Sequence, residues 1–203
     1  MRGPSERQFC PSPLIRLGVA VGSVNRSGGP CEPAPTDDDL RTMLEAAATV
    51  PDHGELRPVR FTVLRGDGLD AFGEVLEEAY FRRCTDSGKA PVPAKAQKER
   101  TKLRRAPMVI VVAAERQPSD KIPWSDQRDA AVCAAEHLLL AAHALGYGAM
   151  WRTGDPCEDE YVKKALGLTP DDAIVGFLYV GTPHEGKEPK AVELDDLVSE
   201  YGA

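Results

Sequence analysis

Ala130-Ala131-Val132-Cys133-Ala134-Ala135, followed by Leu138-Leu139-Leu140-Ala141-Ala142, constrains the architecture of this chain more than any other stretch. Together with the glycine at position 146, it predicts a long helix over residues 126–145 with Ser125 as its N-cap. Apolar groups surround this helix, so each of its faces has to be buried. A chain of 203 residues has little interior for this purpose. A dimer interface would supply the missing cover, and a central helix of a monomer is the alternative.

The strands expected around this helix are read from shorter apolar runs. Residues 107–113 and 173–180 are continuously apolar, which is typical of strands covered on both faces. Residues 59–64 and 147–151 predict two further strands. The other predicted helices run from Thr36 to a stop at Pro51 and over residues 69–83, 94–105 and 158–166. This alternation predicts an α/β or α+β domain.

Composition and charge exclude several classes of protein. Lys and Arg number 25 against 32 Asp and Glu, which gives a net charge of −7 and argues against sequence-independent nucleic-acid binding. No run of 18 apolar residues predicts a membrane span, and the N-terminus lacks the order of a signal peptide. The five cysteines form no CxxC pair, which fits a reducing cytoplasm. We therefore expect a cytoplasmic protein with neither a nucleic-acid nor a membrane partner.

Common catalytic and metal-binding motifs are missing from the sequence. There is no GxGxxG, no phosphate loop, no HExxH and no GxSxG. His137 and His143 are six residues apart on one predicted helix and so lie on different faces. We therefore expect neither a metal site nor a side-chain nucleophile.

Polar residues gather in three places instead. The segment 25–29 (Asn-Arg-Ser-Gly-Gly) can hold a phosphate or form a plain turn. The segment 51–58 follows a helix and carries His53 and Arg57, which either reach a ligand or are solvated charges at a helix stop. The segment 146–154 brings Trp151, Arg152 and Thr153 to the end of a strand, where ligands bind in α/β sheets; a core Trp at a strand-to-loop junction is the alternative.

With these segments the chain resembles the nitroreductase family of FMN-dependent oxidoreductases, and within it the minimal NAD(P)H nitroreductases of the YdjA type. The resemblance runs from about residue 25 to 201, so residues 25–203 are expected to form one nitroreductase-like domain and residues 1–24 a divergent or disordered N-terminal segment. The motifs that carry it are, in order, Glu32-Pro33-Ala34-Pro35-Thr36, Val50-Pro51-Asp52-His53, the entry to a strand at 58–61, Arg105-Ala106-Pro107, Gly146-Tyr147-Gly148, Trp151-Arg152-Thr153-Gly154 and Val175-Gly176-Phe177-Leu178-Tyr179-Val180-Gly181-Thr182-Pro183.

The resemblance implies an α+β fold in which helices flank a mixed sheet, and a homodimer with two FMN sites at the subunit interface. Arg26 and Ser27 match the end of an Arg-Arg-Ser motif that holds FMN, and Asn25 stands at its first position. His53 matches a flavin contact that reaches across from the partner subunit. The segment 141–146 matches one assigned to the nicotinamide nucleotide.

Trp151, Arg152 and Thr153 match the later FMN-binding triplet of the family. Two positions depart from the family pattern. Asn25 removes one phosphate-binding charge, and Thr49 stands where a close relative has an Arg that contacts flavin. By resemblance, these changes predict weaker FMN binding.

The activity implied by the resemblance is a ping-pong hydride transfer. NADH or NADPH reduces FMN, and the reduced flavin then passes electrons to a nitro compound, a quinone or a similar small molecule. The chemistry takes place at the flavin N5, so no catalytic side chain is needed. A flavin enzyme with another acceptor, dehydrogenase-like in purpose, is one alternative, and a non-catalytic dimer with or without flavin is the other.

Overall fold

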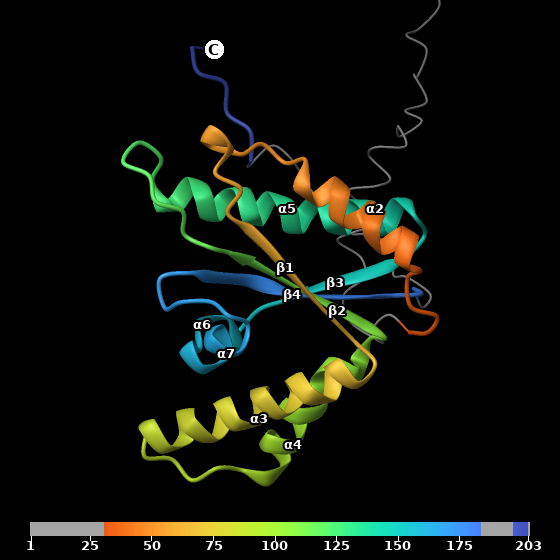
Figure 1. Ribbon diagram of the computed structural model, residues 1–203, viewed down its shortest axis with the longest axis vertical. Helices are drawn as coiled ribbons and strands as arrows, with labels where there is room; N and C mark the ends of the chain where they lie inside the picture. The colour runs from red at the N-terminus through yellow and green to blue at the C-terminus, as the bar shows by residue number, and fades with distance from the viewer. Residues whose placement is uncertain (1–30, 184–196, 203) are drawn as a thin grey trace, which may run out of the picture.

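The computed structural model describes residues 31–183 and 197–202, and its centre is a four-stranded sheet (Figure 1). The strands are β1 (Val59–Arg65), β2 (Met108–Ala114), β3 (Gly148–Arg152) and β4 (Ala173–Gly181). They lie in the order β1-β2-β4-β3, and every pair is antiparallel. The expected α+β class is confirmed, whereas the mixed sheet is not found in the part of the chain that is described.

The antiparallel arrangement follows from the connections. Between β1 and β2 the chain forms two packed helices that run out and back, and so return it to the end of the sheet that it left. The first residue of β2, Met108, pairs with the last residue of β1, Arg65. Parallel pairing would need a crossover to the opposite end.

Helices cover both faces of this sheet (Figure 1). The α-helices are α2 (Asp37–Ala48), α3 (Asp67–Asp86), α4 (Pro93–Thr101), α5 (Trp124–Ala144), α6 (Asp155–Glu158) and α7 (Glu160–Ala165), with short 3₁₀ turns η1 (His53–Glu55) and η2 (Lys102–Arg105). One apolar core lies between the sheet and α2 with α5, and a second between the sheet and α3, η2, α6 and α7. All seven residues of β2 are buried, as the continuous apolar run predicts.

The start of α2 agrees with the sequence in detail. Thr36 is its N-cap, and the Thr36 side chain accepts a hydrogen bond from the backbone N–H of Asp39 at 3.1 Å. The Tyr147 hydroxyl, just before β3, donates to the Asp39 carboxylate at 2.7 Å. Hydrogen bonds from Tyr147 and Thr36 lower the pKa of Asp39. One carboxylate therefore joins the first turn of α2 to the entry of β3.

The long helix α5 differs from the expectation in two ways. It begins at Trp124 with Pro123 as N-cap, and Ser125 donates its hydroxyl to the Asp126 side chain instead of capping the helix. Its buried side carries small residues, chiefly alanines, while Val132, Cys133 and Leu145 on the other side are exposed. Within one chain, α5 is therefore buried on one side only.

The helix expected over residues 158–166 is divided in two. Asp159 takes an extended conformation (φ −82°, ψ 119°), ends α6 and begins α7. Its side chain accepts hydrogen bonds from the backbone N–H groups of Tyr161 and Val162. Asp159 is therefore the N-cap of a new helix and interrupts the predicted continuous one.

Within residues 31–183 and 197–202, none of the helices combines the length and the apolar character that crossing a membrane requires.

Candidate functional site

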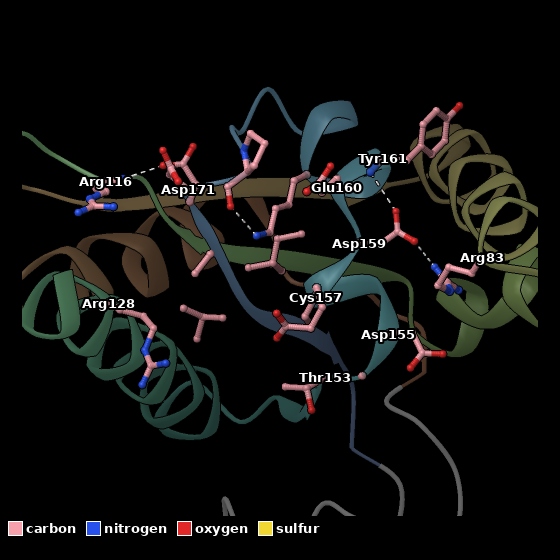
Figure 2. A pocket seen from close by; sticks show the side chains of 18 of the residues that line it. Arg83, Arg116, Arg128, Thr153, Asp155, Cys157, Asp159, Glu160, Tyr161 and Asp171 are labelled. Atoms are coloured by element: carbon pink, nitrogen blue, oxygen red, sulfur yellow. Dashed lines mark hydrogen bonds and ion pairs between the residues drawn. The ribbon is translucent and has the colours of Figure 1, made fainter. Parts of the chain in front are cut away.

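A groove of about 1120 Å³ opens where β3 ends (Figure 2). It exists because β4 is longer than β3. The last residue of β3, Arg152, pairs with Phe177, so residues 173–176 of β4 extend beyond β3 with no strand on that side in the described part of the chain. The groove lies along this overhang, between the N-terminal half of α5 and the helices α6 and α7.

Trp151 forms one edge of the groove. Its indole N–H donates to the backbone carbonyl of Val175 at 3.2 Å, and its ring is half-buried against the core under α5. Val175 is the extra residue of a β-bulge, because Val112 pairs with Gly176 and Ala113 pairs with Ile174. The indole N–H is therefore used by the Val175 carbonyl, and only the apolar part of the ring faces the groove.

Thr153 and Gly154 line the groove next to Trp151. Gly154 has a φ of 118°, which favours glycine, and α6 starts immediately after it. In the described part of the chain, no hydrogen bond engages the backbone N–H groups of these two residues. They are free donors at the mouth of the groove and can bind a ligand that carries oxygen or nitrogen acceptors.

The opposite side of the groove comes from α5, a contribution that the sequence analysis missed. Trp124, Arg128 and Val132 all line it, and their spacing of four residues places them on one stripe of the helix. The only ion pair of Arg128 within the described residues is with its neighbour Asp129, at 3.5 Å. The i, i+4, i+8 spacing of these three residues is the sequence signal that could have placed them on one face of the helix.

The outer end of the groove is acidic and partly occupied by internal contacts. Asp155, Glu158, Glu160 and Asp171 line it without an ion pair among the described residues. Cys157 also lines it, but burial raises the pKa of its thiol to about 11. A thiol with such a pKa stays protonated at neutral pH and is a poor nucleophile.

Arg152 lies on the other face of the sheet. Side chains alternate along a strand, so Arg152 shares a face with Met150 and not with Trp151. Its Nε donates to the Met150 sulfur at 2.9 Å. The nearby phenol of Tyr179 has a pKa raised to about 12 by burial, which the positive charges of Arg105 and Arg152 oppose. Arg152 is exposed and does not line the groove.

His53 lies in η1, near the start of α5. Its side chain is 71% exposed, and its Nδ1 is 3.6 Å from the Asp126 carboxylate. The loop around it is strained, because Glu55 and Arg57 have φ values of 54° and 50°. His53 does not line the groove of its own chain.

The remaining predicted positions add little in this structure. Asn25, Arg26 and Ser27 lie outside the described residues. Thr49 ends α2 and donates its hydroxyl to the backbone carbonyl of Ala46 at 2.8 Å. Of the predicted site residues, the structure therefore brings Trp151 and Thr153 to one groove and leaves Arg152 and His53 elsewhere.

Comparisons with known proteins agree with this fold. The model of the Nitroreductase family matches residues 32–182. The Escherichia coli (strain K12) protein YdjA, provisionally named an NAD(P)H nitroreductase, is 39% identical over 152 residues, which cover 75% of this chain and 80% of YdjA.

Two solved structures share the architecture. A nitroreductase-like protein from Bacillus cereus has a TM-score of 0.75 at 18% identity and covers 100% of both chains. A Desulfovibrio desulfuricans protein in complex with FMN, provisionally described as a nitroreductase, has a TM-score of 0.70 at 23% identity and covers 95% of this chain and 99% of its own. The family model and the identity to YdjA together show that this chain belongs to the nitroreductase family.

Proposed function

We propose that this chain is an FMN-dependent oxidoreductase that uses NADH or NADPH to reduce nitro compounds, quinones or similar small molecules. The observation that carries the proposal is the groove at the end of β3 in a nitroreductase-family chain, bordered by an apolar indole and by backbone N–H groups that have no hydrogen-bond partner among the described residues. The FMN in the Desulfovibrio desulfuricans relative supports the choice of cofactor.

The groove residues fit a flavin ring. The isoalloxazine is flat and apolar on its faces and carries nitrogen and oxygen acceptors along one edge. Trp151 supplies an apolar wall, and the N–H groups of Thr153 and Gly154 supply donors. When FMN is bound, it supplies the hydride and electron chemistry, while the protein supplies position and electrostatics.

The other predicted contacts would meet different parts of the cofactor. Arg152 lies across β3 from Trp151, so it would bind a group beyond the ring that Trp151 borders. By resemblance, Arg26 and Ser27 would hold the phosphate, with Asn25 as a weakened first position. Replacing Arg152 by Ala is expected to lower the flavin content of the purified protein, because a charge-assisted contact is lost. Full flavin content in that variant would refute this role for Arg152.

A homodimer is part of the same proposal. Val132, Cys133 and Leu145 are exposed on the outer side of α5, and Leu140 is half-buried there. A second copy packed on this surface would remove it from water, which is the main driving force for association. By resemblance, His53 of the partner subunit would then contact the flavin. We place this small-molecule enzyme in the cytoplasm.

The test is the visible absorbance spectrum of the purified protein together with its native mass. We expect flavin bands from a dimer, bleached by NADH or NADPH without oxygen and restored by a nitro compound or a quinone. Bleaching without restoration by these compounds would favour a flavin enzyme with another acceptor. A protein that stays colourless after incubation with FMN would refute the proposal and indicate a flavin-free dimer.

A further inference from the structure

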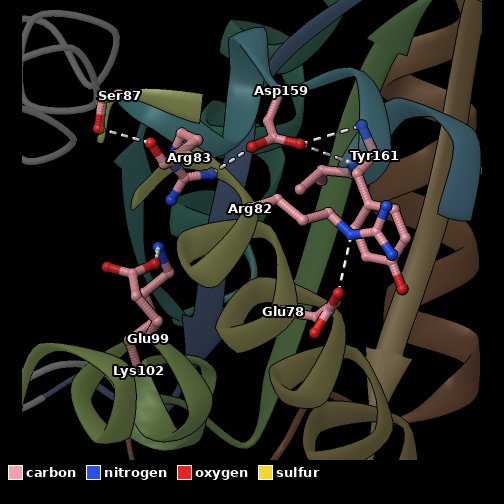
Figure 3. Close-up of polar contacts among 9 residues, drawn as sticks. Glu78, Arg82, Arg83, Ser87, Glu99, Lys102, Asp159 and Tyr161 are labelled. Carbon is pink, nitrogen blue, oxygen red and sulfur yellow. Dashed lines mark hydrogen bonds and ion pairs between the residues drawn. The ribbon is translucent and has the colours of Figure 1, made fainter. Parts of the chain in front are cut away.

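Two adjacent arginines at the end of α3 contact the start of α7 (Figure 3). The Arg83 guanidinium forms an ion pair with the Asp159 carboxylate. The Arg82 guanidinium carbon lies 4.1 Å from the centre of the Tyr161 ring, a cation–π contact. All four residues line the groove at the end of β3, so this junction forms one of its walls.

Asp159 is the centre of this junction. Its side chain is only 7% exposed, and one oxygen accepts hydrogen bonds from the N–H groups of Tyr161 at 3.0 Å and Val162 at 3.2 Å. The other oxygen meets Arg83. The same carboxylate therefore caps α7 and anchors it to α3. Loss of Arg83 would leave the cap in place, but the buried charge would lose its only ion pair among the described residues.

The short helix α6 connects this anchor to the end of β3. It has 4 residues and lies between Gly154 and Asp159. A helix of this length has no stability of its own, so its position depends on the packing of its buried Pro156 and Cys157 and on what holds its two ends. At one end, the Cys157 N–H donates to the Gly154 carbonyl at 2.8 Å. At the other end, Asp159 is held by α3.

We propose that Arg83 is a positioning residue of the groove: its ion pair with Asp159 fixes α6 and thereby the Thr153-Gly154 turn that presents the free N–H donors. Arg83 acts through Asp159 and does not itself carry out chemistry. The part of the inference that concerns flavin rests on the proposed function, whereas the fixing of α6 does not.

The reporter for this inference is the Cys157 thiol, which lies in α6 and is 4% exposed. Iodoacetamide alkylates it only when α6 opens, and peptide mass spectrometry separates it from the other cysteines. Cys84 adjoins Arg83 in the last turn of α3 and is no independent reference, so the dependence of the Cys157 rate on urea separates local opening from unfolding of the whole chain. The matched control is Arg100→Met, which removes the ion pairs between α4 and Glu74 and Glu77 of α3, away from the groove.

In the full-length Arg83→Met protein, we expect Cys157 to be alkylated about tenfold faster, which corresponds to about 1.4 kcal/mol of local opening. The Cys157 rate should depend only weakly on urea, and Arg83→Lys should stay within about threefold of the wild type, because a point charge is retained. Equal Cys157 rates in Arg83→Met and Arg100→Met would overturn the inference. A Cys157 rate that rises with urea as steeply as global unfolding would also overturn it, because α6 would then open only together with the whole chain.

The functional part is measured by titrating each apoprotein with FMN. We expect Arg83→Met to raise the Kd about tenfold and Arg83→Lys to restore it to within about threefold. Faster alkylation with an unchanged Kd would overturn the link to the groove. If FMN fails to bind the wild type while alkylation still responds to Arg83, the proposed function fails and the fixing of α6 stands.

Discussion

Replacing Gly176 by Ala should displace Trp151 and damage the groove. A Cβ at position 176 would lie 2.6 Å from the Trp151 Cδ1 atom and 3.0 Å from the carbonyl oxygen of Arg152. Both neighbours belong to β3, and one of them is backbone. Because the backbone has little freedom to move inside a sheet, the indole has to give way and break its hydrogen bond to Val175.

The magnitude follows from two terms. Overpacking in a well-packed region costs about 1–3 kcal/mol, and the lost hydrogen bond about 0.5–1.5 kcal/mol. Together they lower the free energy of unfolding by about 1.5–4.5 kcal/mol. For a chain of this size, each kcal/mol lowers the Tm by about 2–4 °C.

The assay is urea unfolding at one fixed protein concentration, followed by circular dichroism and by tryptophan emission. We expect a lower midpoint with an unchanged slope, and a red-shifted native emission because Trp151 becomes more exposed. Gly68→Ala is the matched control, since Gly68 lies in the first turn of α3 with no atom near its Cβ position. Helix propensity predicts that this variant is as stable as the wild type or more stable by up to about 1 kcal/mol.

A double-mutant cycle isolates the contact. In a Trp151→Leu background the indole is gone, so Gly176→Ala should cost at least about 1 kcal/mol less than it does in the wild type. Stability of Gly176→Ala within about 0.5 kcal/mol of the wild type, or the same cost in both backgrounds, would refute this account of the groove edge.

Three further predictions concern the rest of the chain. Tyr147→Phe removes a hydrogen bond that lowers the pKa of Asp39 below its ordinary value of 3.8. The stability from this bond is present above that pH and is lost as pH falls through the folded pKa, so the urea midpoints of the variant and the wild type should differ at pH 7 and approach each other as the pH is lowered below 3.8. Asp172→Ala should lower the free energy of unfolding by about 2–4 kcal/mol. The buried Asp172 carboxylate accepts hydrogen bonds from the backbone N–H of Arg116 and from the backbone N–H and hydroxyl of Thr169, and all three are lost. A loss below about 0.5 kcal/mol would contradict this. Val132→Glu places a charge on the outer face of α5 and should shift the native mass toward the monomer, and an unchanged dimer mass would remove this face from the proposed interface.

Much of the fold could be predicted because its signals are local. Thr36 and the acidic first turn that follows it predict the start of α2, and the apolar run before Glu115 predicts β2. The break at Asp159 was missed because a cap competes with helix continuation, and an Asp inside a helical pattern does not say which will win.

The site was harder to predict because it depends on strand lengths and pairing. The rule that placed a ligand at the end of β3 applies to parallel sheets, and this sheet is antiparallel in its described part. The groove arises from the overhang of β4 beyond Arg152. Side chains alternate along a strand, so the sequence does predict that Trp151 and Arg152 face opposite sides of the sheet. Treating Trp151, Arg152 and Thr153 as one binding motif ignores this alternation.

The strongest sequence signal for the groove lies in β4 and not in β3. A glycine inside an apolar strand weakens it, so such a residue usually marks a bulge or a close approach. Gly176 marks both, because it adjoins the bulge at Val175 and lies under the indole of Trp151. The apolar run of β4 thus contains a position, Gly176, where a side chain would displace Trp151 from the edge of the groove. A nitroreductase-family chain with a larger residue at this position should hold its groove edge differently, and with it the ring that the groove is proposed to bind.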